Sequence, residues 1–141
     1  DKYRVESQPE LLASIARFMS ELIPDNIDYL AALEMGGIPI ATALSLRTGI
    51  PVVFVRKEAK KYGTCKLAEG LDIQNKRLLI VEDVVTSGGQ VVISANDLRN
   101  LGAIVSSAIC VIDRQSGGKE HLKNNEIDLI SLFTMDELKQ A

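Results

Sequence analysis

The sequence contains no tryptophan, and aromatic residues make up only 4% of its 141 positions. Hydrophobic residues nevertheless reach 46% of the chain, and leucine, isoleucine, valine and alanine dominate them. Aliphatic residues of this kind are typical of a buried parallel sheet covered by helices. A chain of this length usually builds one hydrophobic core, so residues 1–141 are predicted to form a single domain.

The sequence also lacks signals for disulfides, a zinc site, nucleic-acid binding and membrane insertion. The two cysteines, Cys65 and Cys110, lie far apart, which indicates neither a disulfide framework nor a zinc site built from cysteine pairs. The formal net charge of −3 argues against a broadly basic surface for nucleic acid. No apolar run approaches the ~20 residues of a membrane span, and no signal peptide opens the chain. We therefore expect a soluble, cytoplasmic protein that binds neither nucleic acid nor membrane.

Two common phosphate-binding motifs are also missing. The sequence contains no G-x-x-x-x-G-K-[ST] loop and no G-x-G-x-x-G fingerprint. These absences disfavour a nucleoside triphosphatase and a standard dinucleotide-binding enzyme.

Hydrophobic periodicity predicts helices and strands that alternate along the chain. Helices are expected at residues 9–22, 39–47 and 88–100, with a short one from Met135, and strands at residues 27–33, 51–55, 78–81, 103–112 and 127–132. Residues 56–70 are polar and rich in cations, and they are predicted to form a mobile loop. The alternation indicates βαβ units, and hence an α/β fold with a doubly wound, mostly parallel sheet flanked by helices.

Residues 78–90 carry the strongest chemical signal. They read LLIVEDVVTSGGQ, an apolar strand followed by two acids and a turn of small residues that opens a helix. Ligands of open α/β sheets bind beyond the carboxyl ends of strands, where Glu82 and Asp83 are expected to emerge. The backbone N–H groups of residues 86–90 can bind a phosphate at the helix N-terminus. The two carboxylates would repel that phosphate, so they are expected to accept hydrogen bonds from sugar hydroxyls or to help hold a metal.

Residues 81–89, VEDVVTSGG, resemble the phosphoribosyl pyrophosphate (PRPP) signature of the type I phosphoribosyltransferases. Three more segments resemble the orotate phosphoribosyltransferase branch of that family: RKEAKKYG at 56–63 its flexible catalytic loop, EMGGIP at 34–39 its pyrophosphate loop, and DRQSGG at 113–118 its orotate-recognition stretch. Their order and spacing match from about Tyr3 onward. The resemblance implies the type I phosphoribosyltransferase fold and transfer of the 5-phosphoribosyl group from PRPP to orotate, which yields orotidine 5′-phosphate and pyrophosphate.

The same resemblance assigns roles to individual residues. Glu82 and Asp83 would bind the ribose hydroxyls, and Gly36 and Gly37 would contact pyrophosphate through backbone groups. Positive charge develops on the ribose ring as pyrophosphate leaves, so groups that stabilise the departing anion matter most. The implied catalytic residues are Arg56, Lys60 and Asp83. The other implied contacts are Lys57 and Tyr62 in the flexible loop, Arg114 as a guanidinium fork for orotate, and Val84, Val85, Thr86, Ser87, Gly88, Gly89 and Gln90 around the 5′-phosphate.

The resemblance further implies a cofactor and an assembly. Mg²⁺ would bridge pyrophosphate and the ribose hydroxyls, held through substrate and water with no direct protein ligand. Cations of the flexible loop reach into the neighbouring subunit's site in this family, which implies a homodimer with shared active sites.

The chain departs from the family at three places. Gly36 stands where many members have a lysine, and Tyr62 where they have a histidine. Full-length orotate enzymes carry an N-terminal hood over the base, and Asp1 follows it, so we expect either a fragment or a short relative with a different second substrate. His121, the only histidine, is expected at the surface with no assigned role.

Two alternatives to orotate transfer stay open. One is a transferase that acts on a purine or another base. The other is a regulator of the same fold that senses PRPP without turning it over. The acidic balance and the cations of residues 56–63 count against the regulator.

Overall fold

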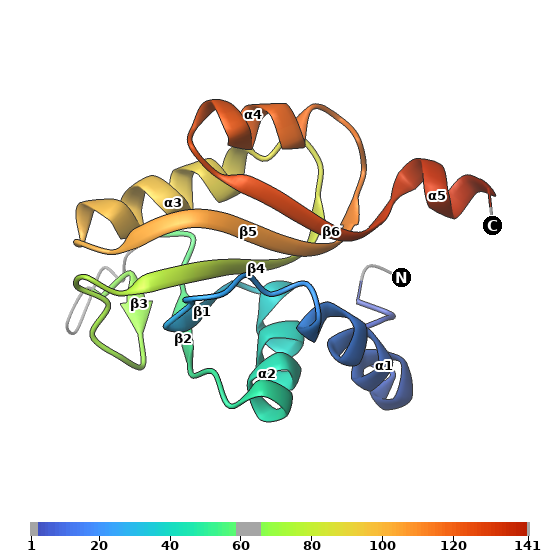
Figure 1. The fold of residues 1–141 in the computed structure, drawn as a ribbon, viewed down its shortest axis with the longest axis horizontal. Helices are drawn as coiled ribbons and strands as arrows, with labels where there is room; N and C mark the ends of the chain where they lie inside the picture. The colour runs from blue at the N-terminus through green and yellow to red at the C-terminus, as the bar shows by residue number, and fades with distance from the viewer. Residues whose placement is uncertain (1–2, 59–65, 141) are drawn as a thin grey trace.

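The computed structural model describes residues 3–58 and 66–140. The strands are β1 (Tyr29–Leu33), β2 (Val52–Val55), β3 (Ala68–Glu69), β4 (Arg77–Val85), β5 (Ile104–Asp113) and β6 (Asp128–Thr134). The helices are α1 (Pro9–Ser20), α2 (Gly37–Thr48), α3 (Gly89–Asn100), α4 (Gly118–Asn124) and α5 (Met135–Gln140). The strands form one sheet in the order β3-β2-β1-β4-β5-β6, and its neighbours pair in parallel except β3, which runs antiparallel to β2 (Figure 1).

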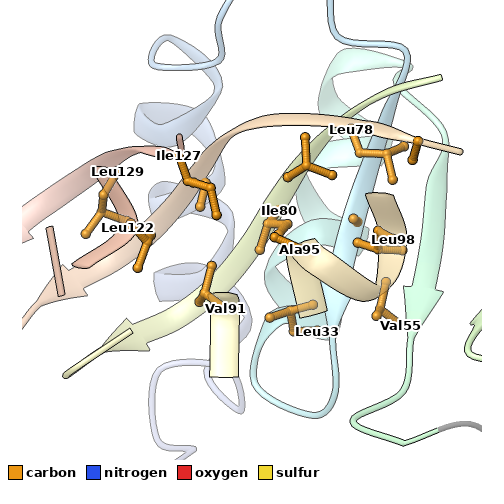
Figure 2. Close-up of a cluster of buried hydrophobic side chains, with 14 of the residues drawn as sticks. Leu33, Val55, Leu78, Ile80, Val91, Ala95, Leu98, Leu122, Ile127 and Leu129 are labelled. Atoms are coloured by element: carbon orange, nitrogen blue, oxygen red, sulfur yellow. The ribbon is translucent and has the colours of Figure 1, made fainter. Parts of the chain in front are cut away.

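Helices cover both faces of this sheet. Helices α1 and α2 pack on one face, and α3 and α4 on the other (Figure 1). Side chains alternate along a strand, so Leu30 and Ala32 of β1 join the core under α1 and α2, while Ala31 and Leu33 join the core under α3 and α4. Figure 2 shows the second core, with Leu98 of α3 among the strand side chains. Burial on both faces explains why the strands read as nearly continuous apolar runs.

The predicted α/β fold with a doubly wound, mostly parallel sheet is confirmed, but three elements differ from the prediction. Strand β4 continues to Val85 rather than ending at residue 81, because it pairs with β5 as far as Asp113. The short strand β3 lies within the segment that was predicted to be a loop. Helix α4 was not predicted, since its seven residues are mostly polar and bury one large apolar side chain, Leu122. Within the described residues, no helix has the length and apolar character to cross a membrane.

The topology brings two turns together at one edge of the sheet. Strands β1 and β4 are parallel neighbours, with Ala32 paired to Val81. Their carboxyl ends therefore meet, and each is followed closely by a helix, α2 after β1 and α3 after β4. The first residue of α2, Gly37, lies so near β4 that a Cβ there would overlap the carbonyl oxygen of Val81. Helix α2 thus begins in direct contact with β4 at Val81.

Replacing Gly37 with alanine tests this contact. We expect Gly37→Ala to lower the free energy of unfolding by about 1–3 kcal/mol, because backbone of β4 must move to admit the methyl group. Gly89→Ala is the matched control: Gly89 is the first residue of α3, and its Cβ would meet only Ser87 Oγ at 3.7 Å. Denaturant unfolding of both variants measures the difference. Equal changes in the two variants would contradict the proposed close packing.

Candidate active site

Two neighbouring acids lie near the end of β4. Asp83 is only 9% exposed and Glu82 is half-buried. Asp83 Oδ1 accepts a hydrogen bond from the N–H of Val84 at 2.7 Å, and Glu82 Oε1 accepts one from the N–H of Asp83 at 3.0 Å. The two side chains form an acid pair whose carboxyl groups are held by the local backbone.

The surroundings of this acid pair favour a bound proton. Burial raises the pKa of Glu82 to about 8, and its hydrogen bond with the Asp83 side chain and the charge of Asp83 act in the same direction. The N–H of Asp83 and the charge of Lys57 oppose the rise. Glu82 therefore holds its proton at neutral pH in the ligand-free chain. A cation or a set of hydroxyl donors placed against the pair would favour the ionised form.

The turn between β1 and α2 lies directly against the acid pair. A Cβ on Gly36 would overlap the Asp83 carboxyl group, with Oδ1 only 2.6 Å away. A lysine at position 36 would therefore require Asp83 and the turn to move apart. The same turn contains a cis peptide bond between Glu34 and Met35. Gly36 and Gly37 thus lie next to the acids and β4, and their role as a pyrophosphate loop stays a prediction.

The described part of the predicted catalytic loop is tied to this turn and to β3. Glu34 Oε1 accepts a hydrogen bond of 2.6 Å from the N–H of Lys57. The Arg56 guanidinium donates to Glu69 Oε2 from Nε at 2.9 Å and from Nη2 at 2.6 Å. Sequence reasoning missed this ion pair, because its two members lie 13 residues apart and only the antiparallel pairing of β2 and β3 brings them together. Lys60 and Tyr62 lie outside the described residues.

The loop after β4 presents backbone donors at the start of α3. Gly88 has a left-handed φ of 82°, and no side chain caps the helix. Among the residues that the structure describes, none accepts a hydrogen bond from the N–H groups of Ser87, Gly88 or Gly89. Free N–H groups at a helix N-terminus suit an anion. The role of residues 86–90 as a phosphate loop stays a prediction.

Other members of the predicted loop contribute through the backbone. The Val85 side chain is buried in the core, and its carbonyl oxygen accepts a hydrogen bond from the N–H of Arg114 at 2.9 Å. Gln90 Nε2 donates to Ser94 Oγ at 3.1 Å, so its side chain is held along α3. Thr86 is exposed, and Val84 is half-buried. Any ligand contact of Val85 in this conformation therefore uses main-chain atoms.

Arg114 follows β5 beside this loop, and its side chain is exposed. The preceding residue, Asp113, is buried and accepts a hydrogen bond from the N–H of Gln115 at 2.8 Å. Asp113 thus holds the start of the DRQSGG stretch, and the exposed Arg114 follows at the carboxyl ends of β4 and β5.

His121 is a contact that sequence reasoning did not find. Its side chain is exposed, as expected, but Nδ1 donates a hydrogen bond to the carbonyl oxygen of Ser87 at 3.0 Å. The two residues are 34 positions apart. No local pattern could connect them, because the contact depends on where α4 packs.

The raised pKa of Glu82 predicts how the free energy of unfolding changes with pH. In the free chain, Glu82 is protonated up to a pKa of about 8, whereas the unfolded chain ionises it near 4.5. Between these values the folded state binds more protons, so a rise in pH lowers the free energy of unfolding. Glu82→Gln cannot ionise, so its stability relative to wild type should grow from pH 5 to pH 8 and then level off. Urea unfolding at several pH values, with the exposed Glu120→Gln as control, measures this; a constant offset would contradict it.

Known proteins resemble this chain in sequence. A family model described as phosphoribosyl transferase domain matches residues 3–134. An orotate phosphoribosyltransferase of Nocardioides sp. is 46% identical over 141 residues, which cover 100% of this chain and 79% of that protein. The orotate phosphoribosyltransferase of Halobacterium salinarum is 38% identical over 141 residues, with 100% of this chain and 80% of that protein covered.

The fold has similar solved structures as well. Orotate phosphoribosyltransferase of Mycobacterium tuberculosis H37Rv, in complex with PRPP, aligns with a TM-score of 0.84 at 27% identity, covering 99% of this chain and 82% of that chain. The relatives in sequence and the similar solved structure are all orotate phosphoribosyltransferases. This chain belongs to the phosphoribosyl transferase domain family.

Proposed function

We propose that this chain is an orotate phosphoribosyltransferase, which transfers the 5-phosphoribosyl group of PRPP to orotate and releases orotidine 5′-phosphate and pyrophosphate. The observation that carries the proposal is the acid pair at the end of β4, with the glycine turn against Asp83 on one side and a loop of free N–H groups on the other. Relatives named orotate phosphoribosyltransferase, which match the chain over its whole length, support orotate as the acceptor.

The acid pair and the following loop bind the ribose 5-phosphate part of PRPP in this proposal. Asp83 and Glu82 accept hydrogen bonds from the ribose hydroxyls, which favours the ionised form of Glu82. The N–H groups of residues 86–90 bind the 5′-phosphate with the partial positive charge of α3 behind them. The ribose hydroxyls thus meet hydrogen-bond acceptors, and the 5′-phosphate meets hydrogen-bond donors. This difference allows the sugar phosphate to bind in one orientation.

The glycine turn and the cationic loop act on the leaving group. Gly36 and Gly37 offer backbone N–H groups to pyrophosphate, and Arg56, Lys57 and Lys60 add positive charge, with Tyr62 as a hydroxyl donor. Stabilising the anion as it departs lowers the barrier for breaking the bond at C1 of the ribose. Arg56 is partly exposed in its pair with Glu69, and such pairs contribute little free energy. Arg56 can therefore exchange Glu69 for pyrophosphate at a small cost in free energy.

The proposal includes Mg²⁺. Within residues 3–58 and 66–140, no three histidine, cysteine, aspartate or glutamate side chains converge as a metal cage. Glu82 and Asp83 are neighbouring carboxylates that would accept hydrogen bonds from the hydroxyls and waters around an ion held through substrate and water. When bound, the ion neutralises charge on pyrophosphate and so favours its departure.

The proposed assembly is a homodimer in the cytoplasm. Residues 56–63 of one subunit would reach the site of the other, as the resemblance to the orotate branch implies. The start of this segment, at Arg56 and Lys57, lies beside the glycine turn, which is consistent with a loop that serves an active site.

A turnover assay with a base panel tests the proposal. When the chain is mixed with PRPP, Mg²⁺ and each base in turn, orotate should be consumed and purines should not. Absorbance follows the loss of each base. Arg114→Gln should raise the KM for orotate about tenfold or more while the Kd for PRPP stays constant, because a charged hydrogen bond to the base is lost. Lys119→Gln, exposed on α4, is the control for a lost surface charge.

Other outcomes of the assay separate the alternatives. Consumption of a purine but not of orotate would replace the acceptor base. Tight PRPP binding without turnover of any base would identify a sensor of PRPP and would overturn the enzymatic proposal for this chain.

A further inference from the structure

Helix α4 packs directly against the loop that follows β4. It begins next to the start of α3 (Figure 1). A Cβ on Gly118 would come within 2.6 Å of the carbonyl oxygen of Thr86, and a Cβ on Gly88 would overlap Leu122 Cδ1. Two glycines, one from each segment, therefore permit this approach. The conformation of the loop depends on α4 as well as on its own sequence.

One polar contact crosses this interface. His121 Nδ1 donates to the carbonyl oxygen of Ser87 at 3.0 Å. The backbone of His121 is fixed on both sides, because its N–H donates to the carbonyl of Gly117 at 3.0 Å and its carbonyl accepts from Asn125 Nδ2 at 2.9 Å. The imidazole thus extends from a hydrogen-bonded turn of helix, and its bond restrains a carbonyl group of the loop.

Restraining the Ser87 carbonyl also orients the N–H of Gly88. The two groups belong to one planar trans peptide unit, so they point in opposite directions. With the carbonyl directed at α4, the N–H of Gly88 is directed away from α4. Gly88 has a φ of 82°, and glycine occupies positive and negative φ about equally well. Glycine alone would therefore let this peptide rotate, and the bond from His121 selects one orientation.

We propose that His121 is a positioning residue for the 5′-phosphate of PRPP, because it fixes the Ser87–Gly88 peptide with its N–H toward the phosphate. This inference rests on the proposed function, in which residues 86–90 bind that phosphate. His121 acts through the peptide and makes no contact with the ligand itself. Without His121, only a fraction of the molecules hold the Ser87–Gly88 peptide in the orientation that binds the phosphate. The apparent affinity for PRPP is then reduced in proportion to that fraction.

Binding measurements on His121 variants test this role. We expect His121→Ala to raise the Kd of PRPP and the KM for PRPP about two- to tenfold, the size of one net hydrogen bond. The kcat and the KM for orotate should stay within about twofold of wild type. His121→Asn should restore PRPP affinity, because asparagine Nδ2 can take the place of histidine Nδ1, whereas His121→Gln should not. Lys123→Ala, exposed on α4, is the control for a lost cation.

Two simpler ligands locate the effect. Ribose 5-phosphate should bind His121→Ala more weakly by the same factor as PRPP, and pyrophosphate should bind it as it binds wild type. An unchanged Kd for PRPP in His121→Ala, an equal change in Lys123→Ala, or an asparagine variant as weak as alanine would overturn the inference. Failure of ribose 5-phosphate to compete with PRPP in the wild-type chain would instead overturn the proposed phosphate loop, and the positioning role with it.

Discussion

The candidate site depends on the close approach of the turn between β1 and α2 to the end of β4. A Cβ at Gly36 would overlap the Asp83 carboxyl group, and a Cβ at Gly37 would overlap a carbonyl of β4. Only backbone fits between these segments. Because β1 and β4 are parallel neighbours, this contact lies at the carboxyl edge of the sheet, where ligands of open α/β folds bind. The turn and the acids therefore form one structural unit.

This packing sets the electrostatics of the site. The turn buries Asp83, and the desolvation of Glu82 beside it raises the pKa of Glu82 to about 8. A buried acid pair with one proton is a poor acceptor until a ligand supplies hydroxyl donors and positive charge. The loop after β4 has the opposite character, since its free N–H groups favour an anion. The acid pair and the loop both lie at the end of β4, and α4 holds the loop in place through His121.

Much of this could be predicted from the sequence, because the signals are local. The apolar strand, the acids and the two glycines of residues 78–90 lie in one stretch, and aliphatic runs that alternate with helices indicate a parallel sheet. Contacts between distant segments could not be predicted. Arg56 pairs with Glu69 only because β3 folds back on β2, and His121 reaches Ser87 only because a short polar helix packs under the loop. The extension of β4 to Val85 likewise depends on its pairing with β5.

The proton balance of PRPP binding tests most directly whether the buried acid pair receives the ribose. Calorimetric titrations with PRPP and Mg²⁺ at pH 7, in buffers of different ionisation enthalpy, count the protons released. Glu82 is protonated in the free chain, given its pKa of about 8, and should ionise when ribose hydroxyls bind. The wild-type chain should release about one proton more per site than Glu82→Gln. Equal release by the two proteins would contradict the account.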